Sequence, residues 1–252
     1  MRFLPVLLGV VLSLAACTTE RVIEPNDAKL AADLNAQLGL GYMNQGHYKR
    51  AMEKLEKSLK FNSDNVQAHH YKAELHRRLK QVDEAEKHYQ EAMSLAPKDA
   101  NIKNNYGVFL CEQGKYDLAY AQFKSSTEDP LYTARAAAHE NIGLCSMREG
   151  KLREAEQSFR NALKINPKMP KSLIELAQLS YDRGNKKEAY DYFSRYVAIA
   201  QHTPESLWMG ILLENERNNK NTVASYKVLL KGKYPDSKQA KLLEKLERQG
   251  KL

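Results

Sequence analysis

The stretch IGLCSMREGKLREAEQSFRNAL, residues 142–163, decides the fold because related stretches recur along the chain. Copies also start at residues 38, 72, 106 and 176, so consecutive copies are 34, 34, 36 and 34 residues apart. Each copy holds two apolar-periodic runs around a short polar turn, which is typical of a pair of helices. A unit of this size cannot bury its apolar face alone, so the period predicts a stack of helical hairpins.

The positions that the copies share carry the residue types that two packed helices require. A Gly or Ala at the eighth position lets the helices of one hairpin approach closely. A large residue at position 24 fills the groove between neighbouring repeats, as in Leu55, Tyr89, Phe123, Phe159, Phe193 and Tyr226. Period and positions match the tetratricopeptide pattern. We therefore predict an all-α fold, a right-handed superhelix (α-solenoid) of about six tetratricopeptide repeats with a C-terminal capping helix.

The domain boundaries follow from the repeat period. We expect repeats to start near residues 32, 66, 100, 136, 170 and 203, within one domain over 31–235, and the capping helix to lie within 236–252. The two extra residues fall in SSTEDPLYTA, residues 125–134. There Pro130 should end a helix early, and Leu131 and Tyr132 should pack a longer connection.

The N-terminal residues predict export and lipidation. Residues 1–16, MRFLPVLLGVVLSLAA, place one positive charge before a short apolar run, as a secretory signal peptide does. The run ends in Leu14-Ala15-Ala16-Cys17, the bacterial lipobox, so we expect a lipid on Cys17. An ordinary signal peptide followed by a chance cysteine is the alternative. Residues 17–30 are polar and are expected to be a lipidated tether.

Residue 18 bears on where such a lipoprotein would reside. It is Thr, whereas the usual retention signal for the inner membrane is Asp, so we expect lipid anchoring at the periplasmic face of the outer membrane. No run after Cys17 is apolar enough over about 20 residues to span a bilayer. Apart from the covalent lipid on Cys17, no cofactor is expected.

The charge pattern argues against nucleic acid as a partner. The formal net charge is +8, but Lys and Arg alternate with Glu along most of the chain, as on solvated helix faces. Residues 227–252 are the exception, with eight Lys or Arg and three Asp or Glu. We interpret this segment as a basic capping helix, with contact to an acidic partner or anionic lipid as the alternative. No basic stripe interleaved with aromatic residues is present.

Signals for catalysis or metal binding are missing. The sequence has no phosphate-binding loop, nucleophile elbow or paired-carboxylate motif, so we expect no enzyme. His69, His70 and His76 share a predicted helix but lack acidic or Cys partners at ligand spacing, so no metal site is expected. Cys111 and Cys145 are predicted to be buried or half-buried free thiols, because packed helix axes lie about 8–10 Å apart and the two side chains should point differently. A disulfide between them is the alternative, since the periplasm is oxidising.

The inner face of the stack is the candidate partner-binding surface, because first helices line the concave side of such arrays. Its apolar and amide residues are Leu40, Met43, Asn104, Asn105, Val108, Cys111, Asn141, Leu144, Met147, Ile174 and Tyr181. Apolar patches with a polar rim often mark binding sites. Asn105 and Asn141 stand where Asn often bonds an extended peptide backbone. The alternatives are a groove filled internally, or binding by the convex face or the first repeat.

Three stretches carry a resemblance that goes beyond the generic repeat. They are QLGLGYMNQGHYKRAMEKLEKSL, NNYGVFLCEQGKYDLAYAQF with the following DPLYTARAAAHENIGLC, and SLWMGILLENERNNKNTVASYKVLLKGKYPDS. Together with the lipobox they resemble the type IV pilus biogenesis lipoproteins of the PilF/PilW family over nearly the whole processed chain. The resemblance implies a pilotin, a lipoprotein that binds the pilus secretin and promotes its outer-membrane targeting and multimerisation. We expect a monomer. A pilus-stabilising factor and a general envelope scaffold remain as alternatives.

Overall fold

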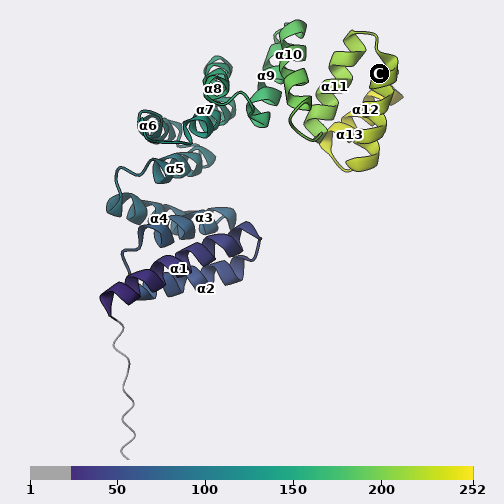
Figure 1. Ribbon diagram of the computed structural model, residues 1–252. Coiled ribbons are helices and arrows are strands. Elements are labelled where there is room, and N and C mark those ends of the chain that lie inside the picture. The colour runs from purple at the N-terminus through teal and green to yellow at the C-terminus, as the bar shows by residue number, and fades with distance from the viewer. Residues whose placement is uncertain (1–23, 252) are drawn as a thin grey trace, which may run out of the picture. The chain divides into compact units, whose positions relative to one another are not determined.

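The computed structural model describes residues 24–251, and this part of the chain consists of thirteen α-helices without a strand (Figure 1). The predicted all-α solenoid of tetratricopeptide-like hairpins is thereby confirmed. Cys17 and the predicted signal peptide lie outside the described residues. The chain divides into two compact units at Ala68 and His69.

The first unit contains the hairpin of α1 (Pro25–Asn44) and α2 (Tyr48–Phe61), followed by the start of α3 (Val66–Arg78). Leu55 of α2 is fully buried, and a Cβ atom added to Gly39 of α1 would lie 2.6 Å from its Cγ. The missing side chain at Gly39 therefore sets how closely the two helices pack. Ser58 Oγ adds a buried hydrogen bond to the Ala32 carbonyl at 2.7 Å.

The tether was predicted too long. Residues 17–30 were predicted to be a polar tether, whereas α1 begins at Pro25, so residues 25–30 belong to a helix. Proline at the first helical position has the helical φ angle and gives up an N–H that would be unpaired there anyway. Asp27 in the first turn adds a negative charge at the positive end of the helix dipole. These two residues explain the earlier helix start.

The second unit holds the remaining hairpins, which follow one another along the chain. Their helices are α4 (Val82–Leu95), α5 (Ala100–Glu112), α6 (Tyr116–Thr127), α7 (Arg135–Glu149), α8 (Leu152–Ile165), α9 (Pro170–Asp182), α10 (Lys186–Val197), α11 (Pro204–Glu216), α12 (Lys220–Lys233) and α13 (Lys238–Arg248). Helices α3, α5, α7, α9 and α11 begin within a residue of the repeat starts expected near 66, 100, 136, 170 and 203.

Aromatic rings packed on glycines hold these hairpins together. A Cβ atom at Gly107 would lie 2.7 Å from the ring of Phe123, and one at Gly143 would lie 2.6 Å from the ring of Phe159. Both rings are fully buried. Real Cβ atoms do not approach ring carbons this closely, so each glycine makes room for the aromatic residue sixteen positions later.

The turns between paired helices use a left-handed residue. Gly114, Gly150 and Gly184 have φ angles of 73°, 85° and 80°. The corresponding residue in the α3–α4 turn is Lys80 with φ 59°, and in the α11–α12 turn it is Asn218 with φ 56°. A side chain in this conformation crowds its own backbone, so Lys80 is destabilising in a way that the glycine turns avoid, and Asn218 less so because Asn tolerates this region.

Lys80→Gly is therefore expected to raise the free energy of unfolding by up to about 1 kcal/mol. The matched control is Lys98→Gly, at an exposed turn residue outside the left-handed region. Glycine there only adds disorder to the unfolded chain, so it should not stabilise. Chemical denaturation of both variants checks this, and stabilisation by both would contradict the explanation.

The connection between α6 and α7 is longer than the others, as the two extra residues predicted. Tyr132 is 7 % exposed and packs on Ala100 and Ala138, as expected. The prediction for Leu131 was wrong, because its side chain is 85 % exposed. Leu131 lies in a turn in which the Tyr132 N–H donates to the Asp129 carbonyl at 3.2 Å, and this turn places Tyr132 inward and Leu131 outward.

Helix α13 closes the C-terminal end of the second unit. Ser237 caps it by accepting a hydrogen bond from the Ala240 N–H at 3.1 Å. Leu243 is fully buried in a cluster with Leu207 and Leu230. Within residues 24–251, no helix combines the length and the apolar character that crossing a membrane requires.

Candidate partner-binding site

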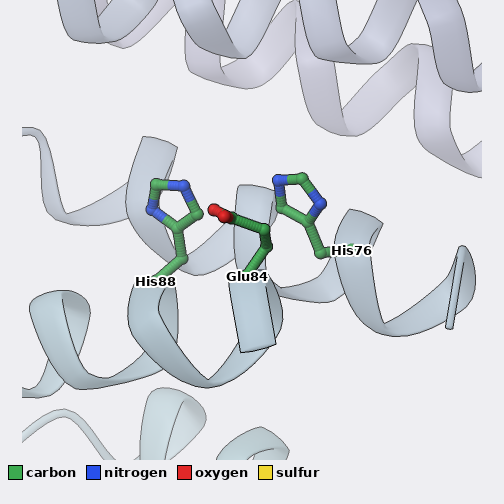
Figure 2. A group of neighbouring side chains, drawn as sticks. All are labelled: His76, Glu84 and His88. Atoms are coloured by element: carbon green, nitrogen blue, oxygen red, sulfur yellow. The ribbon is translucent and has the colours of Figure 1, made fainter. Parts of the chain in front are cut away.

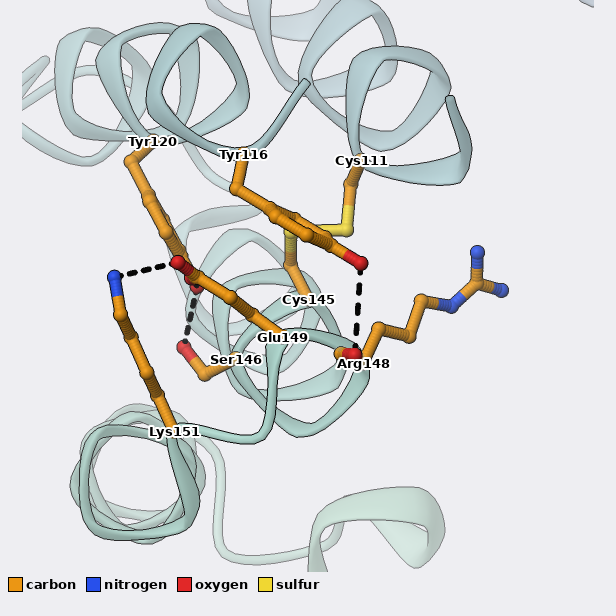
Figure 3. Close-up of a disulfide and its surroundings, with 8 residues drawn as sticks. All are labelled: Cys111, Tyr116, Tyr120, Cys145, Ser146, Arg148, Glu149 and Lys151. Carbon is orange, nitrogen blue, oxygen red and sulfur yellow. Dashed lines mark hydrogen bonds and ion pairs between the residues drawn. A yellow bond between two sulfur atoms is a disulfide. The ribbon is translucent and has the colours of Figure 1, made fainter. Parts of the chain in front are cut away.

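A disulfide bond joins Cys111 of α5 to Cys145 of α7, with the Cα atoms 5.8 Å apart (Figure 3). The expectation of free thiols was therefore wrong. Helix axes do pack about 8–10 Å apart, but Cα atoms lie about 2.3 Å off each axis, so facing residues come several ångströms closer. The bond locks the first helices of two consecutive repeats.

A cavity of about 170 Å³ opens beside this bond, and we refer to it as the disulfide cavity. Its lining residues are Val108, Cys111, Glu112, Phe123, Asn141, Leu144, Cys145 and Arg148. Its interior is apolar, and Glu112 and Arg148 are exposed and charged. Sites for drug-sized ligands measure about 300–1,000 Å³, so this cavity suits a single side chain of a partner.

Two tyrosines of α6 hold the C-terminal end of α7 beside the disulfide (Figure 3). Tyr120 Oη lies 3.1 Å from Ser146 Oγ and donates to Glu149 Oε2 at 2.8 Å. Tyr116 Oη donates to the Arg148 carbonyl at 3.5 Å. Lys151 Nζ forms an ion pair with Glu149 at 2.7 Å. These contacts fix the wall of the disulfide cavity on the α7 side.

A row of amide side chains crosses from α3 to α7. Asn141 Nδ2 donates to Asn104 Oδ1 at 3.1 Å, and Asn104 Nδ2 donates to Asn105 Oδ1 at 3.2 Å. Asn105 Nδ2 lies 2.9 Å from His70 Nε2. Burial lowers the pKa of His70, so a neutral ring with an accepting Nε2 suits this contact. Each amide nitrogen carries a second hydrogen that the row does not use.

The rim near Glu112 is an ion-pair network. Arg77 reaches Glu112 at 2.8 Å and Glu74 at 3.0 Å. Tyr89 donates to Glu74, and burial together with that carboxylate raises the pKa of Tyr89, so its hydroxyl stays protonated. Glu74 is buried, and its carboxylate oxygens are bound by Arg77 and Tyr89. The network positions the carboxylate of Glu112 at the mouth of the disulfide cavity.

The structure brings together only part of the predicted groove. Val108, Cys111, Asn141 and Leu144 line one cavity, and Asn104 and Asn105 adjoin it through the amide row. The other predicted residues behave differently. Ile174 is 8 % exposed and belongs to the core, while Met147 and Tyr181 are half-buried against that core. In the first unit, Met43 is 2 % exposed and Leu40 is half-buried.

Met43 and Ile174 are thus core residues rather than groove residues. A first helix in a solenoid contacts its own partner helix and the next repeat, so only a narrow strip remains open. Cys145 was not predicted to line the groove, because Cys111 and Cys145 were expected to point in different directions and to remain unbonded. Their separation of one repeat length was the available signal.

Comparison with protein families supports the repeat assignment. Residues 42–105 match a tetratricopeptide repeat family. Residues 131–228 match the middle TPR-like domain of cilia and flagella-associated protein 70. These two matches cover hairpins on both sides of the long α6–α7 connection.

Individual relatives are similar over most of the chain. The type IV pilus assembly protein PilF of Pseudomonas aeruginosa is 32 % identical over 207 residues, which are 82 % of this chain and 82 % of PilF. A solved structure of P. aeruginosa PilF has a TM-score of 0.79 at 30 % identity and covers 86 % of this chain and 98 % of its own. A crystal structure of PilW, a type IV pilus biogenesis factor, has a TM-score of 0.74 at 28 % identity, with 84 % and 97 % covered.

Proposed function

Because the chain belongs to the family of the type IV pilus assembly protein PilF, we propose that it acts in type IV pilus biogenesis as an outer-membrane pilotin. It binds the pilus secretin and promotes the targeting and multimerisation of that ring protein. The protein works as a binding scaffold and not as a catalyst. The similarity to PilF over most of both chains is the observation that carries the proposal.

The lipobox supplies the location in this proposal. A lipid on Cys17 holds the repeats at the periplasmic face of the outer membrane, where the secretin must assemble. Holding two partners at one membrane raises their effective concentration, so even a modest binding surface suffices.

The disulfide cavity supplies the binding surface. We assign to it one apolar side chain of an extended secretin segment, held among Val108, Leu144 and Phe123. The half-exposed amides of Asn105 and Asn141 have hydrogens left for the backbone of that segment. Interfaces concentrate their binding energy in a few such filled pockets.

The first experiment is a membrane-fraction blot for heat-resistant secretin multimers in a strain lacking this protein and in one carrying Cys17→Ala. Loss of multimers in the deletion, and their retention in the inner membrane with the unlipidated form, is the expected result. Normal multimers in both strains would overturn the pilotin role and favour a general envelope scaffold.

Leu144→Arg tests the binding surface separately. The long charged side chain would occupy the cavity meant for the apolar side chain of the secretin segment and would have to lose water when that segment binds, so affinity should fall more than about tenfold and multimers should be lost. The control is Leu118→Arg on α6, at a leucine that is 57 % exposed and does not line the cavity. Both variants should keep wild-type abundance. Normal multimers with Leu144→Arg would rule out the cavity as the site.

A further inference from the structure

Three metal-binding side chains meet on the α3–α4 hairpin, away from the disulfide cavity (Figure 2). His76 comes from the last turn of α3, and Glu84 and His88 lie one turn apart on α4. One nitrogen of each histidine and one carboxylate oxygen all lie within 4.8 Å of one another. Figure 2 shows the carboxylate of Glu84 between the two imidazole rings.

His76 presents an unused ligand atom to this cluster. Its side chain is buried, with 7 % of its surface exposed, and its Nε2 has no hydrogen-bond partner. Its Nδ1 lies 2.6 Å from Gln81 Oε1, which can only accept, so Nδ1 carries the proton. The Nε2 lone pair is then available. A buried nitrogen without a partner costs free energy and calls for an explanation.

His88, like His76, has a contact on the ring nitrogen that faces away from the cluster. Its Nδ1 lies 3.0 Å from Nδ1 of His69, which leaves its Nε2 for the cluster. The ring planes of His76 and His88 differ by 7°. Metal-binding histidines usually have such a partner on the second nitrogen, which fixes the ring orientation.

We propose that His76, Glu84 and His88 form a binding site for a divalent transition metal ion, with Zn²⁺ as the best-matched ion. Two imidazoles and one carboxylate are an established Zn²⁺ ligand set that leaves a fourth position open. Ca²⁺ and Mg²⁺ prefer oxygen ligands alone, so they match this set poorly. Tetrahedral Zn²⁺ places its ligand atoms about 3.4 Å apart, so binding an ion requires side-chain shifts of up to about 1 Å by the three ligands.

This site corrects the prediction that the histidines lack an acidic partner. Glu84 is four residues before His88 on one helix face, but His76 joins them only through the turn that contains Lys80. A bound ion would clamp α3 to α4, and it would stabilise the hairpin because only the folded chain presents all three ligands. This inference does not depend on the pilotin role.

Calorimetric titration of ZnCl₂ into the full-length protein, purified in detergent and without a polyhistidine tag, tests the proposal. We expect one ion per chain and a rise in Tm with Zn²⁺. Glu84→Gln and His76→Gln should each weaken binding at least about tenfold and abolish the Tm shift. Glu84→Gln changes an exposed residue, so it tests the site even if His76→Gln fails to fold.

The matched controls are Glu91→Gln, at an exposed position of α4, and His139→Gln, at a half-buried position of α7. Both should bind Zn²⁺ as the wild type does. Absence of stoichiometric binding by the wild-type protein would overturn the proposal. Equal affinity in the Glu84→Gln and Glu91→Gln variants would overturn it as well.

Discussion

Reduction of the Cys111–Cys145 disulfide is expected to lower the free energy of unfolding of the second unit by about 3–4 kcal/mol. The bond closes a loop with a sequence separation of 34 residues. The chain entropy that such a loop removes from the unfolded state corresponds to about 3.8 kcal/mol at 25 °C. The loop contains α6 and most of α7, so the affected region is the centre of the repeat array.

Denaturant unfolding with and without a reductant measures this effect. The double variant Cys111→Ala/Cys145→Ala should match the reduced wild type and should not respond to the reductant. This control separates the disulfide from other effects of reducing conditions. A wild-type midpoint that does not move on reduction would show that the bond contributes nothing to stability. Because repeat arrays unfold in neighbouring blocks, the reduced protein should also show a broader transition.

Phe159→Ala is expected to cost about 3–5 kcal/mol of unfolding free energy. The ring is fully buried and packs directly on Gly143 within the core cluster formed with Leu173 and Leu176. Removing it takes away apolar contact area and leaves a cavity that the rigid hairpin cannot close. Leu131→Ala is the control, because that leucine is 85 % exposed and its truncation should change stability by less than about 0.5 kcal/mol.

A double-mutant cycle tests the mechanism. Gly143→Ala should destabilise the wild type, because its Cβ would lie 2.6 Å from the Phe159 ring. The same change made in Phe159→Ala meets a cavity and should cost less. A coupling of about 0.5–3 kcal/mol is expected for residues in direct contact. Additive effects would mean that the glycine does not serve to seat the ring.

The repeat period predicted most of the fold because it records a physical requirement that every hairpin repeats. A small residue and a large residue sixteen positions apart must meet in each unit, and Gly107 with Phe123 or Gly143 with Phe159 do so. Structural features that occur only once in the chain were harder to predict from the repeat period. Pro25 starts a helix inside the predicted tether, and Leu131 faces solvent because its neighbour Tyr132 is the buried one.

The candidate sites were predicted only in part, since they depend on how helices face one another. Val108 and Leu144 line the same cavity, and their repeat positions alone were enough to group them on one face. The disulfide was not predicted because it depends on the distance between the Cα atoms of Cys111 in α5 and Cys145 in α7. An average distance between helix axes does not give that distance. The cluster of His76, Glu84 and His88 depended on side-chain directions across a turn, which sequence spacing does not report.

The disulfide also limits how far the chain can be drawn out by force. A pull transmitted through the backbone passes from Cys111 directly to Cys145, so the segment between them bears no load until the bond is reduced. About 110–120 Å of contour length is withheld in this way. An array fixed at one end and pulled by a partner at the other would yield in its outer hairpins first, and its centre would act as a mechanical stop.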